Sequence, residues 1–204
     1  MKSDLVIIGA GGHGRVVADI ALKSEKYKNI YFLDDAVTSD QLGLPVLGTV
    51  SEVNNFCATA DFFVAVGNSD ARKRITEIIK SEGCSIATLV HPAAVIGKDV
   101  SIDEGSVIMA GVVINPCVKI GRGVIVNTSS SIDHDCRICD YSHISVGAHI
   151  AGMTTIGRGT WVGAGSTVIE SLSVCDDCFI GAGSVVVKSI AESGKYFGVP
   201  ARKK

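Results

Sequence analysis

The stretch from Ile96 to Val186 decides the fold, because every sixth residue in it is isoleucine or valine. Part of it, residues 124–150, reads VIVNTSSSIDHDCRICDYSHISVGAHI. The aliphatic positions are Ile96, Ile102, Ile108, Ile114, Ile120, Val126, Ile132, Ile138, Ile144, Ile150, Ile156, Val162, Val168, Val174, Ile180 and Val186. A fixed period of this length indicates a solenoid, and a period of six is typical of a parallel β-helix. An amphipathic α-helix would instead repeat its apolar residues every 3.6 positions.

Each hexad predicts a short strand followed by a corner. Two residues before each aliphatic position stands a second series, which is small or β-branched except at Leu172. Side chains alternate between the faces of a strand, so both series should point inward and the residue between them outward. Gly, Asn and Asp recur directly after the aliphatic position, where a corner needs the dihedrals that they tolerate. Three hexads should close one triangular coil of about 18 residues.

Composition excludes several classes of function. The 204 residues suit one or two domains, and 47% of them are hydrophobic, which is ample for a core. A formal net charge of −2 gives no electrostatic reason to expect nucleic acid as a partner. No apolar run approaches the roughly 18 residues of a membrane span, and the N-terminus does not look like a signal peptide. We therefore expect a cytoplasmic protein, not bound to a membrane, whose seven cysteines are free thiols.

Two Cys-x-x-Cys pairs, Cys136 with Cys139 and Cys175 with Cys178, have the spacing of a zinc motif. However, Cys139 and Cys175 are two whole coils apart, which places them roughly 10 Å apart along one column. Thiolates that share a zinc ion at about 2.3 Å lie only about 4 Å from each other. Cys136 and Cys178 should point inward from different faces. We therefore expect no metal site.

The N-terminal segment reads as strand, glycine loop and helix. A buried strand at 5–8 leads into Gly9-Ala10-Gly11-Gly12-His13-Gly14 and an apolar-periodic segment at 16–22. The glycine spacing fits the dinucleotide-binding fingerprint, and Asp34 follows a second strand at 30–33. A helix N-terminus at this loop would offer backbone amides to a phosphate. The alternative is a tight turn that binds no ligand.

Further strands are expected at 62–66 and 86–90, with a helix through 72–80 and an irregular or hairpin segment at 43–50. Four strands make only half of a doubly wound sheet, too little for NAD, so a mononucleotide or a nucleotide-sugar is the better expectation. We predict an α/β half-Rossmann domain over residues 1–90. An all-β parallel β-helix with a short C-terminal tail should follow over residues 91–204.

The outward positions of the hexads sort into three columns at 18-residue spacing. Two of them are Val113, Ser131, His149, Thr167 and Val185, and Lys119, Arg137, Thr155 and Ser173. The remaining column is apolar and consists of Val107, Ile125, His143, Trp161 and Phe179. An exposed apolar column favours a partner surface, so we expect the protein to oligomerise through it.

His134 is the candidate catalytic base. It stands at a corner beside Asp135, and the residue one coil later is Gly152, which leaves open space next to the imidazole. This combination suits general-base catalysis, although a solvated turn histidine is the alternative. No hexad is interrupted, so the wall of an active site must come from the N-terminal domain or from a neighbouring chain.

The chain resembles a known family at several motifs. They are residues 7–14 (IIGAGGHG), 32–35 (FLDD), 66–68 (VGN), 126–136 (VNTSSSIDHDC), 143–148 (HISVGA) and 198–201 (GVPA). These are similar to motifs of the bacterial hexapeptide-repeat acetyltransferases with an N-terminal nucleotide-sugar domain. That family includes sialic acid O-acetyltransferases and the UDP-4-amino-sugar N-acetyltransferases of bacillosamine-type pathways.

The resemblance implies a homotrimer with a left-handed β-helix, an exception to the usual right-handed crossover. It implies that His134 is the general base and that Asp135 is its acidic neighbour. Acetyl-CoA would lie along the solenoid between chains, near Asn127, His143, Gly152, Ala164 and Ala182. The UDP-sugar would contact Gly12, His13, Gly14, Asp34, Asp35 and Gly67. The basic tail at 202–204 either meets CoA phosphates or is solvated.

The resemblance therefore implies an acetyl-CoA-dependent N-acetyltransferase that modifies the 4-amino group of a UDP-4-amino-4,6-dideoxy-sugar in surface glycan biosynthesis. The amine would attack directly, with histidine as base. Two alternatives stay open at this point: sialic acid O-acetylation, and a non-catalytic nucleotide-sugar-binding trimer.

Overall fold

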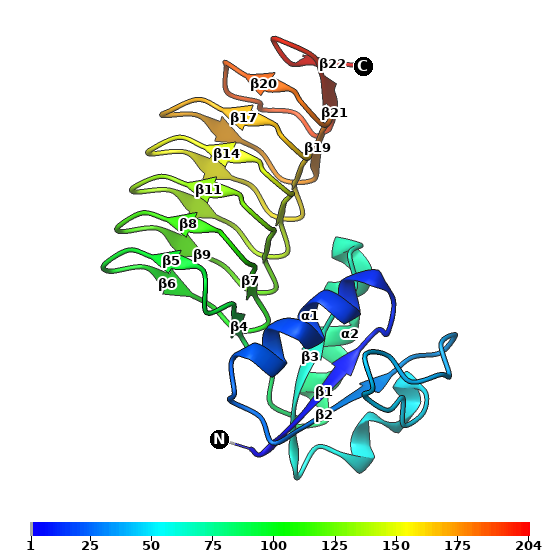
Figure 1. The fold of residues 1–204 in the computed structure, drawn as a ribbon. Helices are drawn as coiled ribbons and strands as arrows, with labels where there is room; N and C mark the ends of the chain where they lie inside the picture. Colours follow the sequence, from blue (N-terminus) through cyan, green and yellow to red (C-terminus); the bar gives the residue numbers. More distant parts are fainter. Residues whose placement is uncertain (1) are drawn as a thin grey trace. The chain divides into compact units, whose positions relative to one another are not determined.

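The structure is a computed structural model that describes residues 2–204 and divides into two compact units, one ending at Pro92 and the other beginning at Ala93. The first unit contains a parallel sheet in the order β2-β1-β3 (Figure 1). These strands span Asp4–Ile8 (β1), Asn29–Leu33 (β2) and Ala60–Val64 (β3). Of the expected strand at 86–90, only Ile86 bridges to the sheet, at Phe62, and β4 is confined to Leu89–Val90.

Helices cover both faces of this sheet, as a parallel sheet requires. They are α1 (Gly12–Lys23), the 3-10 helix η1 (Val50–Asn55) and α2 (Ser69–Ser81). One face buries Val6, Ile8, Leu33, Phe62 and Val64 together with Ile79 of α2. On the other face Phe32 is fully buried and lies next to Gly14 of α1. The side chain of Asn68 caps α2 by accepting a hydrogen bond from the Ala71 amide.

Cys57 and Cys84 are joined by a disulfide in this unit. Cys84 belongs to the buried cluster around Ile79, and Cys57 packs against the same cluster, so the core brings together two residues that are 27 positions apart. The expectation that every cysteine is a free thiol is wrong for this pair.

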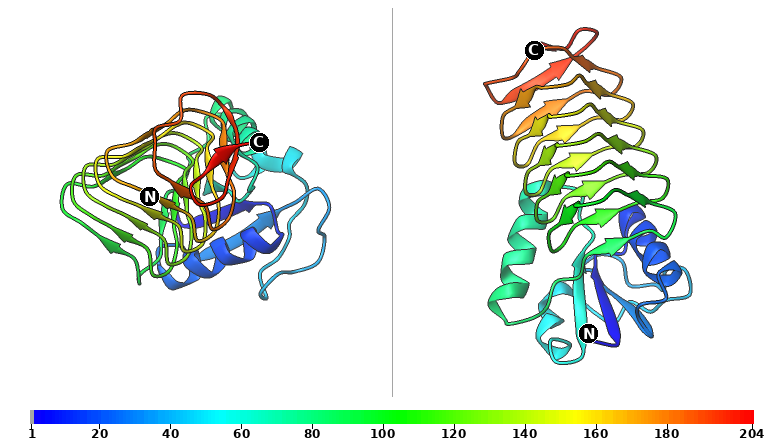
Figure 2. Two further views of the ribbon diagram at one scale, coloured as in Figure 1. Left: turned by 90° about the horizontal axis from the view of Figure 1, so that it is seen from above. Right: turned by 90° about the vertical axis from the view of Figure 1, so that its left-hand side faces the viewer.

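The second unit is a parallel β-helix with three faces (Figures 1 and 2). The first face contains β7 (Val107–Ile108), β10 (Ile125–Val126), β13 (His143–Ile144), β16 (Trp161–Val162), β19 (Cys178–Ile180), β21 (Gly194–Phe197) and β22 (Arg202–Lys203). The second contains β5 (Val95–Ile96), β8 (Val113–Ile114), β11 (Ser131–Ile132), β14 (His149–Ile150), β17 (Thr167–Val168) and β20 (Val185–Val186). The third contains β6 (Ser101–Ile102), β9 (Lys119–Ile120), β12 (Arg137–Ile138), β15 (Thr155–Ile156) and β18 (Ser173–Val174).

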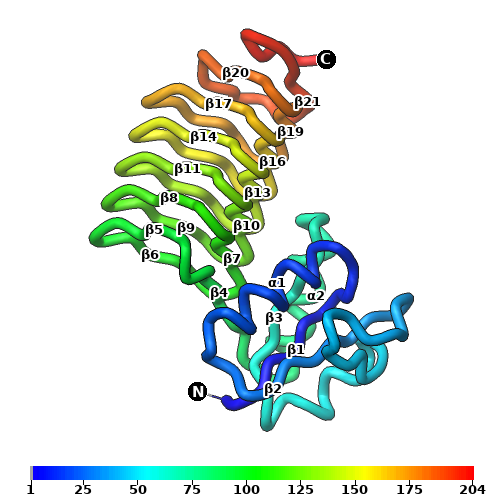
Figure 3. The backbone as a smooth tube through the Cα atoms, in the orientation of Figure 1, coloured from blue at the N-terminus to red at the C-terminus, as the bar shows by residue number. Residues whose placement is uncertain are grey.

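Strands pair with the strand one coil later, 18 residues on, as Ile125 does with His143 and His143 with Trp161. The backbone runs from coil to coil without extruding a long loop (Figure 3). From Ile108 to Val186 every sixth residue is at most 1% exposed. Inward serines satisfy corner carbonyls, since the hydroxyl of Ser166 donates to Gly181 O and that of Ser142 to Cys139 O. The predicted β-helix is confirmed.

The apolar column of the first face differs from its prediction. Val107 and Ile125 are at most 1% exposed and His143 is 8% exposed, so the expectation that this column is free to bind another copy is wrong for these residues. Further along, aromatic rings cover one another: the ring centroids of His143 and Trp161 lie 4.3 Å apart, and those of Phe179 and Phe197 lie 6.0 Å apart. Phe197 belongs to β21, so the C-terminal segment packs on this face.

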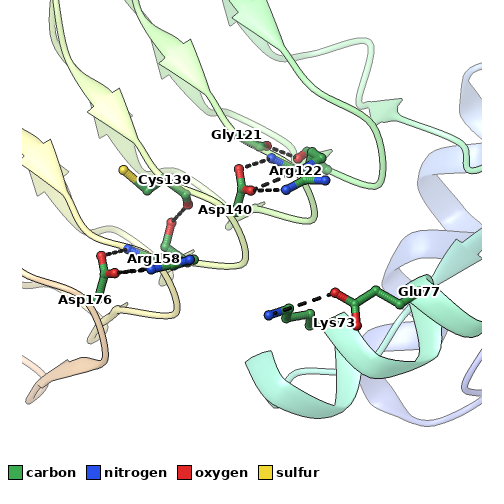
Figure 4. A network of polar contacts seen from close by, with 10 residues as sticks. Lys73, Glu77, Gly121, Arg122, Cys139, Asp140, Arg158 and Asp176 are labelled. Carbon is green, nitrogen blue, oxygen red and sulfur yellow. Dashed lines mark hydrogen bonds and ion pairs between the residues drawn. The ribbon is translucent and has the colours of Figure 1, made fainter.

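A ladder of alternating charges follows the corner between the third and first faces (Figure 4). Arg122 donates from Nε and Nη2 to Asp140 Oδ2 at 3.1 and 2.7 Å, and Arg158 donates likewise to Asp176 at 3.3 and 2.7 Å. The hydrogen bond from Arg158 holds the pKa of Asp176 below its ordinary value. These four residues, which we call the charge ladder, succeed one another at 18-residue spacing on four successive coils and form two ion pairs.

Among residues 2–204, neither α-helix has the length and apolar character that crossing a bilayer would require.

Candidate functional site

His134 lies in the corner between β11 and β12, and its backbone is held on both sides. The amide of His134 donates to Asp133 Oδ1 at 2.8 Å, and its carbonyl accepts the Met153 amide of the next coil at 2.9 Å. Asp135 adopts the left-handed conformation with φ of 56°, which turns the chain immediately after the histidine. The corner therefore fixes the backbone while leaving 51% of the His134 side chain exposed.

The imidazole is oriented by two neighbours, Asp135 and Gly152. The Nδ1 atom lies 2.8 Å from Asp135 Oδ2. A Cβ placed on Gly152 would lie 2.8 Å from His134 Nε2, so the ring rests above this glycine and a side chain at position 152 would displace it. An Nδ1–H that donates to Asp135 leaves Nε2 as the proton-accepting nitrogen. Sequence reasoning placed both neighbours correctly beside the histidine.

Carboxylates around the ring raise the pKa of His134 above its ordinary value, first through the hydrogen bond to Asp135 and then through the charge of Asp133. Asp133 is itself held in place by the Asn115 side chain, which donates to its Oδ1 at 2.6 Å and keeps the pKa of Asp133 low. This pair was not predicted from the sequence, although Asn115 and Asp133 stand one coil apart. The histidine is thus a stronger base than a solvated one.

A groove of about 300 Å³ lies on the second face next to this corner and is lined by Val113, Asn115, Ser131, Asp133 and Ala151, among others. Its wall includes the carboxylate that flanks His134. A larger groove of about 510 Å³ lies on the third face and is lined in part by Lys119 and Arg137. Neither groove is lined by a predicted site residue.

Four of the five residues expected to contact acetyl-CoA lie on two corners of the prism, and the fifth, His143, lies in β13 on the first face. Gly152 lies under His134 at the corner between the second and third faces. Asn127, Ala164 and Ala182 lie at the corner between the first and second faces. Ala164 and Ala182 stand on successive coils, and the amide of Gly183 donates to Ala164 O at 2.8 Å. Asn127 Nδ2 lies 3.1 Å from Nε2 of His143, which is otherwise covered by Trp161.

In the N-terminal unit, the glycines predicted to contact the nucleotide-sugar differ in how much space surrounds them. Gly14 is needed for packing, because a Cβ there would lie 1.9 Å from Gly9 O. Gly12 and Gly67 are open: an added Cβ on Gly12 would first meet an Arg15 nitrogen at 4.0 Å, and no atom of residues 2–204 lies within 4 Å of one on Gly67. Gly11 precedes α1 without a side-chain cap from the described chain, so the first helical amides have no side-chain acceptor there. This turn can accept an anionic group.

The adjacent aspartates of this unit are not equivalent. Asp34 Oδ2 accepts the Ala10 amide at 2.7 Å and Oδ1 accepts the amides of Ala36 and Val37, each at 2.8 Å. These bonds keep the pKa of Asp34 low despite the opposing effect of burial. Asp35 uses Oδ1 for the Val50 amide and is exposed. Asp34 therefore builds the loop, whereas Asp35 retains carboxylate acceptor capacity for a ligand.

His13 is the buried polar group at the start of α1. Burial, helped by the charge of Arg72, lowers the pKa of His13 to about 4, so the ring is neutral at physiological pH. Its Nε2 is buried and has no hydrogen-bond partner within residues 2–204. Arg72 donates from Nη1 to the carbonyls of Val66 and Gly67, which fixes the second loop of the unit. A neutral imidazole between two such loops can donate to or accept from a ligand.

The described residues contain no cluster of three or more His, Cys, Asp or Glu side chains placed to hold a metal ion.

Known proteins resemble this chain in both of its units. Residues 4–79 match the family model described as PglD N-terminal domain, and residues 153–188 match bacterial transferase hexapeptide (six repeats). Over 111 residues the chain is 33% identical to UDP-N-acetylbacillosamine N-acetyltransferase of Bacillus subtilis (strain 168), an alignment covering 52% of this chain and 51% of that protein. The chain thus spans about half the length of this curated relative.

Two solved structures match over nearly the whole chain. The acetyltransferase domain of PglB from Neisseria gonorrhoeae FA1090, in complex with acetyl coenzyme A, is 38% identical with a TM-score of 0.98 and full coverage of both chains. PerB from Caulobacter crescentus, in complex with CoA and GDP-perosamine, is 34% identical with a TM-score of 0.91 and covers 98% of this chain and 97% of its own. The expected fold class, an α/β half-Rossmann domain followed by a left-handed β-helix, is confirmed.

Proposed function

Because the chain belongs to the family of hexapeptide-repeat nucleotide-sugar N-acetyltransferases with a PglD-type N-terminal domain, we propose that it transfers the acetyl group of acetyl-CoA to the amine of a nucleotide-linked amino sugar. The observation that carries this proposal is the His134 corner. Its imidazole has one nitrogen bonded to Asp135 and the other open above Gly152.

The chemistry follows from that geometry. A protonated sugar amine must first lose a proton to free its lone pair. The neutral amine then loses a second proton as its nitrogen attacks the thioester carbonyl, and His134 Nε2 accepts that proton. Asp135 holds the ring and stabilises the imidazolium that forms. The attack is direct, and the products are the acetamido sugar and free CoA. The small residues Gly152, Ala164 and Ala182 and the Asn127–His143 pair fit contacts with the co-substrate along the solenoid.

For the acceptor we propose a UDP-4-amino-4,6-dideoxy-sugar. The turn at Gly12, the neutral His13 and the open Gly67 suit the diphosphate side of such a substrate, and Asp35 suits its nucleoside. The Bacillus subtilis relative is named for a UDP-sugar, which supports uracil. PerB was solved with GDP-perosamine, so a GDP-amino-sugar is the competing acceptor.

The two other functions expected from the sequence receive less support. The curated relative is named as an N-acetyltransferase, the PglB domain was solved with acetyl coenzyme A, and PerB was solved with CoA and an amino sugar. These relatives favour an amine as the acceptor over a sialic acid hydroxyl. A non-catalytic nucleotide-sugar-binding trimer would have no need of a glycine beneath His134.

A coupled assay of thiol release separates these functions. Purified protein is given acetyl-CoA with UDP-4-amino-sugars, GDP-4-amino-sugars or sialic acid. We expect CoA release with the UDP-amino-sugar, and His134→Ala should lower kcat by about 10²–10⁴-fold, the usual contribution of a general base. Faster turnover of the GDP-sugar or of sialic acid would reassign the acceptor. Near wild-type turnover of His134→Ala across pH 6–8 would remove the histidine from the mechanism.

We also propose a homotrimer, in which the two corners that carry the co-substrate residues come from neighbouring chains. The second face lies between those corners, and its strand residues Val95 and Val113 are 61% and 38% exposed. Val146 and Met153, on the two corners, are also about half exposed at 49% and 56%. On the first face Phe179 is also 38% exposed, but Val107, Ile125 and His143 are buried, so the distribution favours the second face as the contact surface.

Light scattering tests this arrangement. Val113→Glu should weaken the trimer because it would bury an unpaired charge at the contact. Trp161→Glu on the first face is the control and should leave the trimer intact. A monomeric wild-type protein would contradict the proposal, and a trimer broken only by Trp161→Glu would return the interface to the first face.

A further inference from the structure

The two Cys-x-x-Cys pairs have the same spacing but opposite positions relative to the coil. Cys136 and Cys139 stand before and after the strand β12, so an extended segment separates them by roughly 10 Å at about 3.3 Å per residue. Cys175 and Cys178 instead flank the corner between β18 and β19, where the chain turns back. As a result the Sγ atoms of Cys175 and Cys178 lie 3.4 Å apart.

A single hydroxyl fixes both ends of the second pair. Thr160 Oγ1 donates to the Cys175 carbonyl at 2.8 Å and accepts the Cys178 amide at 3.1 Å. The two backbones are therefore held together from the coil below, independently of the sulfurs. Bonded sulfurs lie about 2.05 Å apart, so closure requires an approach of about 1.3 Å, within the reach of side-chain torsions.

The two thiols differ in access to solvent. Cys178 is 2% exposed, with its Sγ 3.7 Å from Glu192 O, whereas Cys175 is half-buried at the corner. Burial, together with the neighbouring Cys175, raises the pKa of Cys178 to about 12. The more accessible Cys175 is thus the sulfur that an external reagent meets first, and Cys178 is placed to attack it second.

We propose that low-molecular-weight disulfides reversibly oxidise Cys175 and Cys178 to a disulfide with each other, whereas Cys136 and Cys139 do not form one. The Cys175 thiolate attacks glutathione disulfide, breaking its S–S bond and releasing one glutathione. Cys178 then attacks the Cys175 sulfur of the mixed disulfide and releases the second glutathione, which takes up the Cys178 proton. Two protein thiols are oxidised and one glutathione disulfide is reduced to two thiols.

Peptide mapping of the intact wild-type protein tests this directly. The protein is equilibrated in glutathione buffers of graded redox ratio, free thiols are alkylated, and trypsin is added. Cleavage after Arg158 and Lys188 leaves Cys175 and Cys178 in one peptide, 159–188. Closure leaves that peptide unlabelled and lighter by two hydrogen atoms. Cleavage after Arg137 separates Cys136 from Cys139, so a bond there would join two peptides.

We expect peptide 159–188 to close at a redox ratio at least about tenfold more reducing than any bond between Cys136 and Cys139. In Cys178→Ser, Cys175 should stop at the mixed disulfide with glutathione. In the matched control Cys139→Ser, closure of 159–188 should be unchanged. The proposal is wrong if both cysteines of peptide 159–188 remain alkylated at the most oxidising ratio, or if both cysteine pairs form disulfides at the same redox ratio.

Discussion

Replacing Gly152 by alanine would test the catalytic corner from beneath. The added methyl carbon would lie 2.8 Å from His134 Nε2, 2.9 Å from Cε1 and 3.3 Å from Cδ2. Non-bonded carbon contacts are comfortable at about 3.5–4.0 Å, so the ring has to move away by about 0.7–1 Å. It is free to do so, because the side chain is 51% exposed.

The expected result is a loss of rate without a loss of fold. Misplacing a reacting group by about 1 Å costs up to about 10²-fold, so kcat of Gly152→Ala should fall between about tenfold and 10²-fold in the thiol-release assay. Gly152 does not have a positive φ, and the ring yields into solvent, so the melting temperature should change little.

A double-mutant cycle identifies the cause. With His134→Ala there is no ring to displace, so adding Gly152→Ala should have no further effect on kcat. An equal loss in both backgrounds would mean that the methyl group acts on acetyl-CoA binding instead, and KM for acetyl-CoA would rise with it. Wild-type kcat in the single variant would refute the placement of the imidazole over Gly152.

Further outcomes follow from the charges. The rise of kcat/KM with pH should have its midpoint above about 6.5, because the neutral form of His134 is active and its pKa is raised. Asp135→Asn should move that rise to lower pH, since it removes the largest cause of the shift; an unmoved profile in rate measurements across pH would contradict this. Asp176→Asn should destabilise by no more than about 1 kcal/mol in urea titrations, less at high salt, because its ion pair is exposed. Asp34→Ala should lose about 1–3 kcal/mol with its backbone hydrogen bonds, whereas Asp35→Ala should chiefly weaken UDP binding by calorimetry; the reverse pattern would exchange their roles.

The solenoid could be predicted because its information is local. Each hexad carries its own inward aliphatic residue, and the coils then stack by register alone, so Ile108 and every sixth residue after it up to Val186 are buried as expected. The same periodicity put Gly152 under His134. Hydrogen bonds between loops could not be predicted from the sequence. Asp34 was expected to contact a ligand, but its carboxylate accepts hydrogen bonds from the amides of Ala10, Ala36 and Val37.

Contacts between distant segments were likewise beyond the pattern. The hexad periodicity marks Val107 and Ile125 as outward, yet both are buried, because burial depends on the whole fold and not on the pleat. Cys57 and Cys84 meet through a shared core cluster that no spacing rule encodes. The contact of Cys175 with Cys178 could have been found, since the hexad phase already places that pair across a corner.

The charge ladder distinguishes the addition of an odd number of coils from the addition of an even number. Its members alternate in sign at each step, from Arg122 through Asp140 and Arg158 to Asp176. Duplicating the single coil 123–140 would set two aspartates against each other, whereas duplicating the two coils 123–158 would preserve the alternation. Along this corner the solenoid is therefore compatible with lengthening by pairs of coils. Extension by a single coil would also require the opposite charge at the inserted ladder position and at every ladder position after it.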